Sequence, residues 1–210
     1  MLEFFTIGIA GISLILSIVT LYISHLKKPD LSASAGPKIV AGAHPGYIHF
    51  TIPVSIINSS PSTGVIKQMA LTITRRNEPE KNYYLNWHGF YKISDDGSTW
   101  IHQDVAHSIA IPGHSTVTKS IDFRWFSNSK PKFQLEEGSY IFRIDLWSNG
   151  DKPVATLKHE LQISQREAKE FQNKIPEEKK QNNNIIYLYL DKDIDVNRLL
   201  TKHEVKHLLE

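Results

Sequence analysis

The chain starts with a long apolar segment and then changes to a regular alternation of apolar and polar positions. From Phe4 to Leu26 the sequence contains no Asp, Glu, Lys or Arg. At about 1.5 Å per residue, a helix over this segment would be about 34 Å long, more than the roughly 30 Å of a bilayer's hydrocarbon core. The pattern therefore predicts one transmembrane helix at residues 4–26, preceded by a short flank at residues 1–3.

Residues 47–163 read as short strands separated by turn clusters. In Tyr47 to Ile57 every second residue is apolar, which is the two-residue period of a strand. Trp100 to Ile111 is expected to form one bent strand or two short ones. The other predicted strands are Val65 to Arg75, Tyr83 to Ile93, Ser115 to Phe126, Ser139 to Trp147 and Val154 to Ile163. About seven or eight short strands without helical periodicity between them favour an antiparallel β-sandwich over a βαβ fold.

One short segment narrows this expectation. Leu135 to Phe142 contains Gly138 followed two residues later by Tyr140, and it resembles the tyrosine corner of immunoglobulin-like and fibronectin-type domains. The resemblance implies that Tyr140 starts the penultimate strand of the sandwich and that its hydroxyl bonds back to the turn backbone. Phe142 stands where antibody domains have a disulfide cysteine, so a true antibody-type domain is excluded. The motif indicates an architecture and no function.

The segments on either side of the sandwich differ in character. Residues 27–46 are rich in Gly and Pro and are expected to form a tether, with Ile39-Val40 as the one candidate edge strand. Residues 164–210 are expected to form a small α/β appendage. Its predicted parts are a helix that begins at a Ser164/Glu167 capping box and ends near Asn173, a linker at 177–184, a strand at 185–190 and a C-terminal helix after Thr201.

The charges that flank the apolar segment predict its orientation. Lys27 and Lys28 follow it directly, whereas only Glu3 precedes it. Because the more basic flank stays in the cytoplasm, the segment is expected to act as a signal anchor with the C-terminal domain in the cytoplasm; the alternative is an extracytoplasmic domain. A cleaved signal peptide does not fit, since the N-terminus lacks a basic residue and the apolar run is too long.

Composition excludes several classes of chemistry. The chain has 24 Lys and Arg, 22 Asp and Glu, a net charge of +2 and no cysteine. Cysteine zinc sites, iron–sulfur clusters and a thiol nucleophile are therefore excluded, and no basic field indicates nucleic-acid binding. The nearest basic patch, Arg75-Arg76 beside Tyr83 and Tyr84, is interpreted as an ordinary strand end. No phosphate-binding or dinucleotide-binding glycine motif occurs.

One segment of the sequence matches the consensus of a catalytic motif. His203, Glu204 and His207 form an H-E-x-x-H pattern, in which two histidines one helical turn apart bind zinc and the glutamate polarises water. We reject a zinc site here because only three residues follow His207, which leaves no room for the downstream third ligand. Glu204 fits better as the capping-box partner of Thr201. No metal, cofactor or catalytic residue is expected.

The sequence thus indicates a membrane location and a fold class more clearly than a function. We expect a single-pass membrane protein whose immunoglobulin-like β-sandwich is a non-enzymatic protein-interaction or sensing module. One alternative is a structural subunit of a membrane protein complex. A second and less favoured alternative is a zinc hydrolase built on the terminal H-E-x-x-H match. The expected partners are the bilayer, through Phe4 to Leu26, and one unidentified protein. An exposed tryptophan among Trp87, Trp100, Trp125 and Trp147 would mark a recognition surface.

Overall fold

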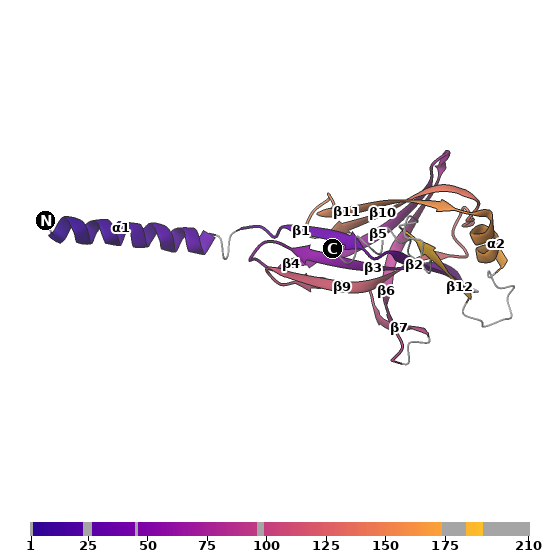
Figure 1. Ribbon diagram of the computed structural model, residues 1–210, viewed down its shortest axis with the longest axis horizontal. Helices are drawn as coiled ribbons and strands as arrows, with labels where there is room; N and C mark the ends of the chain where they lie inside the picture. The colour runs from indigo at the N-terminus through magenta and orange to yellow at the C-terminus, as the bar shows by residue number, and fades with distance from the viewer. Residues whose placement is uncertain (1, 23–26, 45, 96–98, 174–183, 191–210) are drawn as a thin grey trace, which may run out of the picture.

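The computed structural model describes residues 2–22, 27–44, 46–95, 99–173 and 184–190. The chain is mainly β, with antiparallel strands whose arrangement is consistent with a β-sandwich, and a helix, α1 (Leu2–Leu21), leads into it (Figure 1). The strands of the N-terminal half are β1 (Leu31–Ala35), β2 (Lys38–His44), β3 (Tyr47–Asn58), β4 (Gly64–Ile66), β5 (Gln68–Arg75) and β6 (Glu78–Ile93). Those of the C-terminal half are β7 (Trp100–Val105), β8 (Ile109–Ile111), β9 (Ser115–Phe126), β10 (Gly138–Trp147), β11 (Ala155–Ile163) and β12 (Asn184–Tyr189), with helix α2 (Gln165–Asn173) before β12.

Most strands belong to one curled sheet. Its order is β11-β10-β5-β6-β9-β3-β2-β12, with β1 added to β3 and β7 added to β6. The sheet bends into a half-barrel, so the two layers expected of a sandwich are joined through the pairing of β6 with β9. β4 and β8 form a separate two-stranded sheet.

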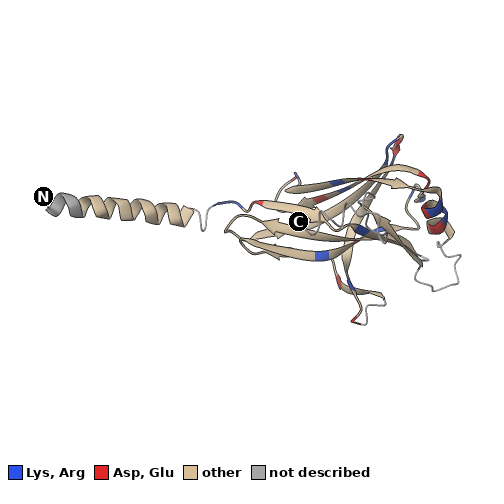
Figure 2. Ribbon diagram, viewed as in Figure 1, with Lys and Arg blue, Asp and Glu red and all other residues tan. Residues whose placement is uncertain are grey.

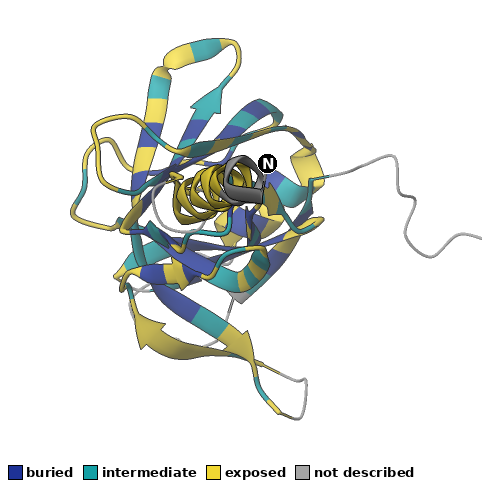
Figure 3. Ribbon diagram, turned by 90° about the vertical axis from the view of Figure 1, so that its left-hand side faces the viewer, coloured by how far each residue is buried: buried dark blue, intermediate teal, exposed yellow. Residues whose placement is uncertain are grey.

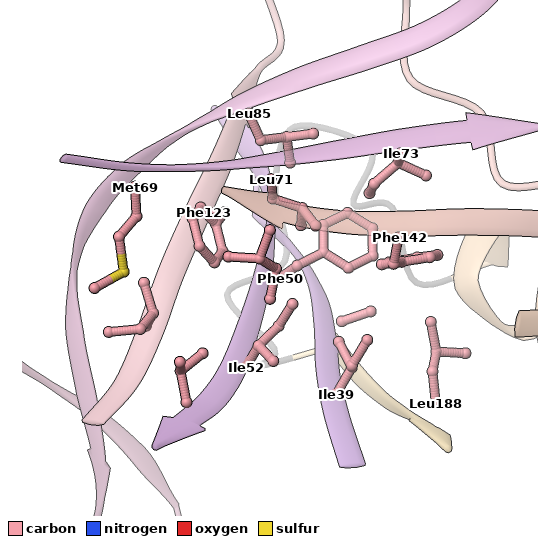
Figure 4. Packing of buried hydrophobic residues seen from close by; sticks show 14 of the residues in the cluster. Ile39, Phe50, Ile52, Met69, Leu71, Ile73, Leu85, Phe123, Phe142 and Leu188 are labelled. Atoms are coloured by element: carbon pink, nitrogen blue, oxygen red, sulfur yellow. The ribbon is translucent and has the colours of Figure 1, made fainter. Parts of the chain in front are cut away.

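The hydrophobic core fills the space inside the curl. Alternate residues of β3, including Phe50 and Ile52, point inward and are buried, as their two-residue period predicts (Figure 4). The ring of Phe50 lies 5.7 Å from the ring of Phe142 in β10 and 5.5 Å from that of Phe133. Strands from the two halves of the curled sheet therefore face each other across one core.

Pro53 lies inside the long strand β3, where its missing N–H would normally break a ladder. β2 pairs with β3 up to Thr51, and β1 pairs with it from Val54 onward. Pro53 thus lies at the point where the pairing of β3 with β2 ends and its pairing with β1 begins. The Pro53 carbonyl accepts a hydrogen bond from the Gly36 N–H at 2.8 Å. A proline inside a strand is usually confined to an edge or a bulge; β3 is an interior strand, and the change of partner accommodates Pro53 there.

The described parts of the two flanking segments belong to the main body rather than to a tether and an appendage. Residues 27–46 contain two strands, β1 and β2, both paired with β3. At the other end of the chain, β12 pairs with β2, and Phe171 of α2 is fully buried against Phe50. The predicted helix and strand of the C-terminal region are present, but they extend and close the same core.

One strand boundary differs from the sequence pattern, and a second segment takes one of the two forms expected of it. The expected strand over residues 65–75 is divided into β4 and β5, which belong to different sheets. The segment 100–111 is two strands, β7 beside β6 and β8 beside β4. The loop that joins β10 to β11 contains Asn149-Gly150 and is longer than a two-residue turn.

Helix α1 projects from one end of the β body (Figure 1). Its described apolar side chains are exposed on all sides, as the end-on view in Figure 3 shows. Within the described residues, no helix combines the length and the apolar character needed to cross a membrane. The predicted transmembrane segment 4–26 extends beyond α1 into residues 23–26, which are not among those described.

Candidate functional site: a buried His-Asp-Arg cluster beneath an aromatic rim

The outward face of the sheet carries polar side chains at the end remote from α1. They come from four strands that lie side by side, β2, β3, β9 and β6. We call this set, together with the aromatic Phe126 that packs against it, the Asp122 cluster; its members are His44, Tyr47, His49, Thr51, His88, Tyr91, Asp122, Arg124 and Phe126.

Strand alternation places the cluster opposite the core. In β3, Phe50 and Ile52 point inward, so His49 and Thr51 point outward. In β9, Ile121 and Phe123 point inward, and Asp122 is therefore on the outer face. The register sets Thr51 opposite Asp122 and His49 opposite Arg124, which brings the four side chains within reach of one another.

The centre of the cluster is buried although it is polar. Asp122 and Thr51 are fully buried, and His49 is only 3% exposed. The Asp122 carboxylate lies 3.2 Å from Nδ1 of His49 and accepts a bond from Nε of Arg124 at 2.6 Å. Arg124 thus provides the positive charge that a buried carboxylate requires.

Gly42 makes room for His49. A Cβ at residue 42 would lie 2.1 Å from Nε2 of His49, far inside van der Waals contact. The imidazole therefore sits directly over the backbone of β2, an approach that only glycine permits. Nε2 of His49 is buried and has no hydrogen-bond partner among the described residues.

Aromatic rings surround this polar centre. The Arg124 guanidinium lies 4.2 Å from the centroid of the Tyr47 ring, a cation–π contact. Tyr91 stacks on His49 with ring centroids 5.7 Å apart, and Tyr47 stacks on His44 at 4.8 Å. Phe126 packs edge-on against Tyr47 and is 43% exposed. The cluster therefore presents partly exposed rings above a fixed charged base.

Burial changes the acid–base properties of the rim. It raises the pKa of Tyr91 to about 12, an effect to which the neighbouring Asp122 carboxylate adds. The pKa values of His44 and His88 are lowered, first by burial and then by nearby positive groups, which include Arg124 in both cases. At neutral pH these groups therefore act as uncharged hydrogen-bonding surfaces around the Asp122–Arg124 pair.

The geometry does not match a hydrolytic triad. A triad needs the carboxylate on one imidazole nitrogen and the nucleophile on the other. Here Asp122 and Thr51 both face Nδ1 of His49, at 3.2 and 3.5 Å. In the described part of the chain, no group of three or more His, Asp or Glu residues is arranged to hold a metal ion. The arrangement supports recognition by shape, aromatic contact and hydrogen bonding.

The basic pair singled out from the sequence has a structural role. Arg75 forms ion pairs with Glu78 and Glu136, and Arg76 pairs with Glu160. These charges are thus neutralised by carboxylates of β6, of β11 and of the loop before β10, and they form no basic surface. Tyr83 is buried in the core, while Tyr84 is 49% exposed.

The four tryptophans are all half-buried, and the edges of Trp87 and Trp125 pack against the core. None of them marks an exposed recognition surface. The rejected H-E-x-x-H residues His203, Glu204 and His207 lie outside the described residues.

The tyrosine-corner contact is present. Tyr140 lies near the start of β10, is 1% exposed, and its hydroxyl accepts a hydrogen bond from the Glu136 N–H at 3.0 Å. Gly138 between them has φ = 145°, a conformation that side-chain-bearing residues rarely adopt. The motif fixes the loop before β10 and is structural.

Sequence reasoning did not assemble the Asp122 cluster. The available signal was the occurrence of polar residues at outward positions, His49 and Thr51 in one strand, Asp122 and Arg124 in another. The two strands are separated by about seventy residues, and their adjacency and register are not encoded in either local pattern.

Comparisons with known proteins add little. No protein-family model matches the chain, and no curated protein matches it. Among solved structures, β-glucuronidase 2 of Bacteroides uniformis in covalent complex with cyclophellitol-6-carboxylate aziridine aligns at 9% identity and a TM-score of 0.36, covering 64% of this chain and 14% of that one. A Bacillus subtilis protein provisionally assigned as a lipoprotein aligns at 13% identity and a TM-score of 0.34, covering 70% and 40%. The chain thus spans well under half of either protein, and likenesses this weak carry no argument about fold or function.

Proposed function

We propose that this protein is a single-pass, membrane-anchored module that recognises another protein through the Asp122 cluster. The membrane anchor is supported by the solvent exposure of the described apolar side chains of α1. Its described apolar side chains, such as Ile12 and Leu16 at 61% and 60% exposed, have no covering partner within the described chain. The sequence continues without charge to Leu26, so the complete apolar segment is long enough to span a bilayer.

The finer fold assignment is an immunoglobulin-like sandwich. The order β11-β10-β5-β6 followed by β9-β3-β1 corresponds to strands G-F-C-C′ and E-B-A of that fold. The Tyr140 hydroxyl contact lies on the strand that would be F, which is where the tyrosine corner occurs. Because that fold serves many functions, the assignment supports a binding scaffold without naming its partner.

The composition of the Asp122 cluster supports protein recognition. Tyrosine and arginine are enriched among the residues that contribute most to protein–protein binding. Here Arg124 is held by a buried carboxylate and lies beneath Tyr47, next to the exposed ring of Phe126. The β3 residues of the cluster lie at the opposite end of that strand from Asn58, which pairs with Leu31 in the segment that follows α1. With α1 as the proposed anchor, the cluster would therefore face away from the membrane.

The anchor is tested by extraction and by topology reporters. The full chain should remain in membranes washed at alkaline pH, and a C-terminal reporter that is active only in the cytoplasm should be active, because Lys27 and Lys28 adjoin the helix. Moving two lysines to the N-terminal flank should reverse the orientation. Release of the chain by alkaline washing would reject the anchor, and activity of an export-dependent reporter would place the domain outside.

The recognition surface is tested by copurification. The full chain, isolated in mild detergent, should retain one protein in fixed proportion, and Phe126→Ser should remove it while the melting temperature stays unchanged. Tyr84→Ser is the matched control, because Tyr84 is similarly exposed but lies outside the cluster. A partner lost with both variants or with neither would contradict this surface. Unfolding of the chain when its partner is absent would instead favour a structural subunit.

A further inference from the structure

A second surface lies at the opposite end of the β body, next to α1. There the segment after α1 and the β10–β11 loop line an open cavity of about 610 Å³, a size typical of small-ligand sites. Lys28 from the segment after α1 and Lys152 from the β10–β11 loop line it, together with the apolar Leu31 and Val154.

The wall formed by the segment after α1 is held in place. The Lys27 N–H donates to the Tyr22 carbonyl at 2.9 Å, which links the segment to the end of the helix. The Ser62 hydroxyl donates to the Lys27 carbonyl at 2.6 Å, and the Ser59 N–H donates to the Asp30 carbonyl at 2.9 Å. Lys28 thus lies between two fixed backbone positions, on a preorganised wall.

This end of the molecule is basic and its lysines are unpaired. Lys27, Lys28, Lys67 and Lys152 form no ion pair within the described residues. Lys67 belongs to the same end, because its N–H donates to the carbonyl of Trp147 just before the β10–β11 loop. Asp30 and Asp151 oppose these four cations and leave a positive excess. Figure 2 shows basic residues in blue directly after the tan turns of α1.

We propose that this cavity binds the anionic headgroup of a membrane phospholipid. The inference rests on the proposed anchoring of α1, since an inserted helix would hold the cavity at the membrane surface. Lys28 and Lys152 would contact the phosphate and carboxylate oxygens of the headgroup, while Leu31 and Val154 would face its glycerol and upper acyl carbons. Juxtamembrane lysines are attracted to anionic lipids in this way, and the apolar wall distinguishes the site from one for free phosphate.

The absence of cysteine makes a direct test available. Asn149→Cys in the loop that lines the cavity introduces one attachment point for an environment-sensitive fluorophore. The labelled full chain, in neutral detergent micelles, is titrated with short-chain phosphatidylserine, with short-chain phosphatidylcholine and with inorganic phosphate. We expect a saturable signal with phosphatidylserine and none with the other two.

Matched variants identify the cavity as the source of the signal. Each lysine near an anionic lipid surface contributes about fivefold in affinity, so Lys28→Gln with Lys152→Gln should weaken phosphatidylserine binding by about 25-fold. Lys132→Gln, an exposed lysine in the loop before β10, should leave it unchanged. Equal responses to phosphatidylserine and phosphatidylcholine, competition by inorganic phosphate, or indifference to the double substitution would overturn the proposal.

The proposal of the anchor and the proposal of the lipid site are rejected by different experimental outcomes. Alkaline extraction reports the anchor alone, and the double lysine variant should stay in the membrane because its apolar helix is intact. A chain that resists extraction but gives no phosphatidylserine signal would reject the lipid site and leave the anchor standing. A chain that is extracted would reject the anchor, whatever the titration in micelles shows.

Discussion

Tyr140 connects the loop before β10 to the core through one buried hydroxyl. Its ring is in the hydrophobic core, and the hydroxyl accepts the Glu136 N–H. Tyr140→Phe keeps the ring and leaves that N–H without its partner, so the free energy of unfolding should fall by about 1 kcal/mol or more. Urea denaturation measures the change, with Tyr84→Phe as the exposed control. A Tyr140→Phe variant as stable as the parent would show that the contact is not a structural tyrosine corner.

Gly42 allows His49 to lie against the backbone of β2. Gly42→Ala would place a methyl group 2.1 Å from Nε2 of His49, and forcing the ring aside should cost about 1–3 kcal/mol of folding free energy. Thermal or urea denaturation gives this value, and Gly150→Ala, which meets no atom within 4 Å, is the control.

The double variant Gly42→Ala with His49→Ala tests whether the clash is the cause. Removal of the imidazole makes room for the methyl group, so the two losses should be less than additive. Strict additivity would mean that the glycine is required for some reason other than the position of His49.

At the level of elements, α2 is a short helix with a complete capping box. The Ser164 and Glu167 side chains each bond the other's backbone N–H, at 3.3 and 2.7 Å. Helices of this length are marginal alone, and α2 gains its stability by burying Phe171 and Ala168 in the core. The capping box sets where the helix begins and therefore which face reaches the core.

Ser164→Ala should lower the free energy of unfolding by about 1 kcal/mol, because the N–H of Glu167 loses its capping acceptor. Lys169→Ala on the exposed face of the same helix is the control and should have a much smaller effect. Equal losses in the two variants would indicate that general helix propensity, rather than the cap, stabilises α2.

At the level of the whole molecule, three half-buried histidines make stability depend on pH. The folded-state pKa values of His44, His88 and His159 are lowered mainly by burial. At a pH between each lowered pKa and the ordinary value of about 6.5, the unfolded chain binds more protons than the folded chain. The contribution of these histidines to the free energy of unfolding is therefore fully present above pH 6.5 and is lost as the pH falls below it.

The melting temperature should therefore decrease between pH 7 and pH 5. His44→Gln with His88→Gln should flatten this dependence and leave the part that His159 contributes. Differential scanning calorimetry over this range measures both slopes. A melting temperature that rises on acidification would contradict the direction of these pKa shifts.

Local patterns in the sequence determined the strands, their buried faces and two short-range contacts of this protein. Alternation in segments such as residues 47–57 and 115–126 predicted strands and their buried faces, since a strand with one face on a core must repeat every two residues. The Ser164/Glu167 capping box and the Tyr140 corner were predicted because their partners lie within four residues of one another. The apolar segment near the N-terminus was also evident, and its insertion in a membrane stays a prediction.

The tertiary structure decided which strands are neighbours. The described parts of the expected tether and appendage belong to the main body, because β2 and β12, far apart in the chain, pair with each other. The Asp122 cluster exists only because β3, β9, β6 and β2 lie in that order, in a register that sets Thr51 opposite Asp122. Register between distant strands depends on the packing of the whole core, and a shift by one residue would turn these side chains to the other face. The local sequence pattern specifies each face, and only the assembled sheet specifies which faces meet.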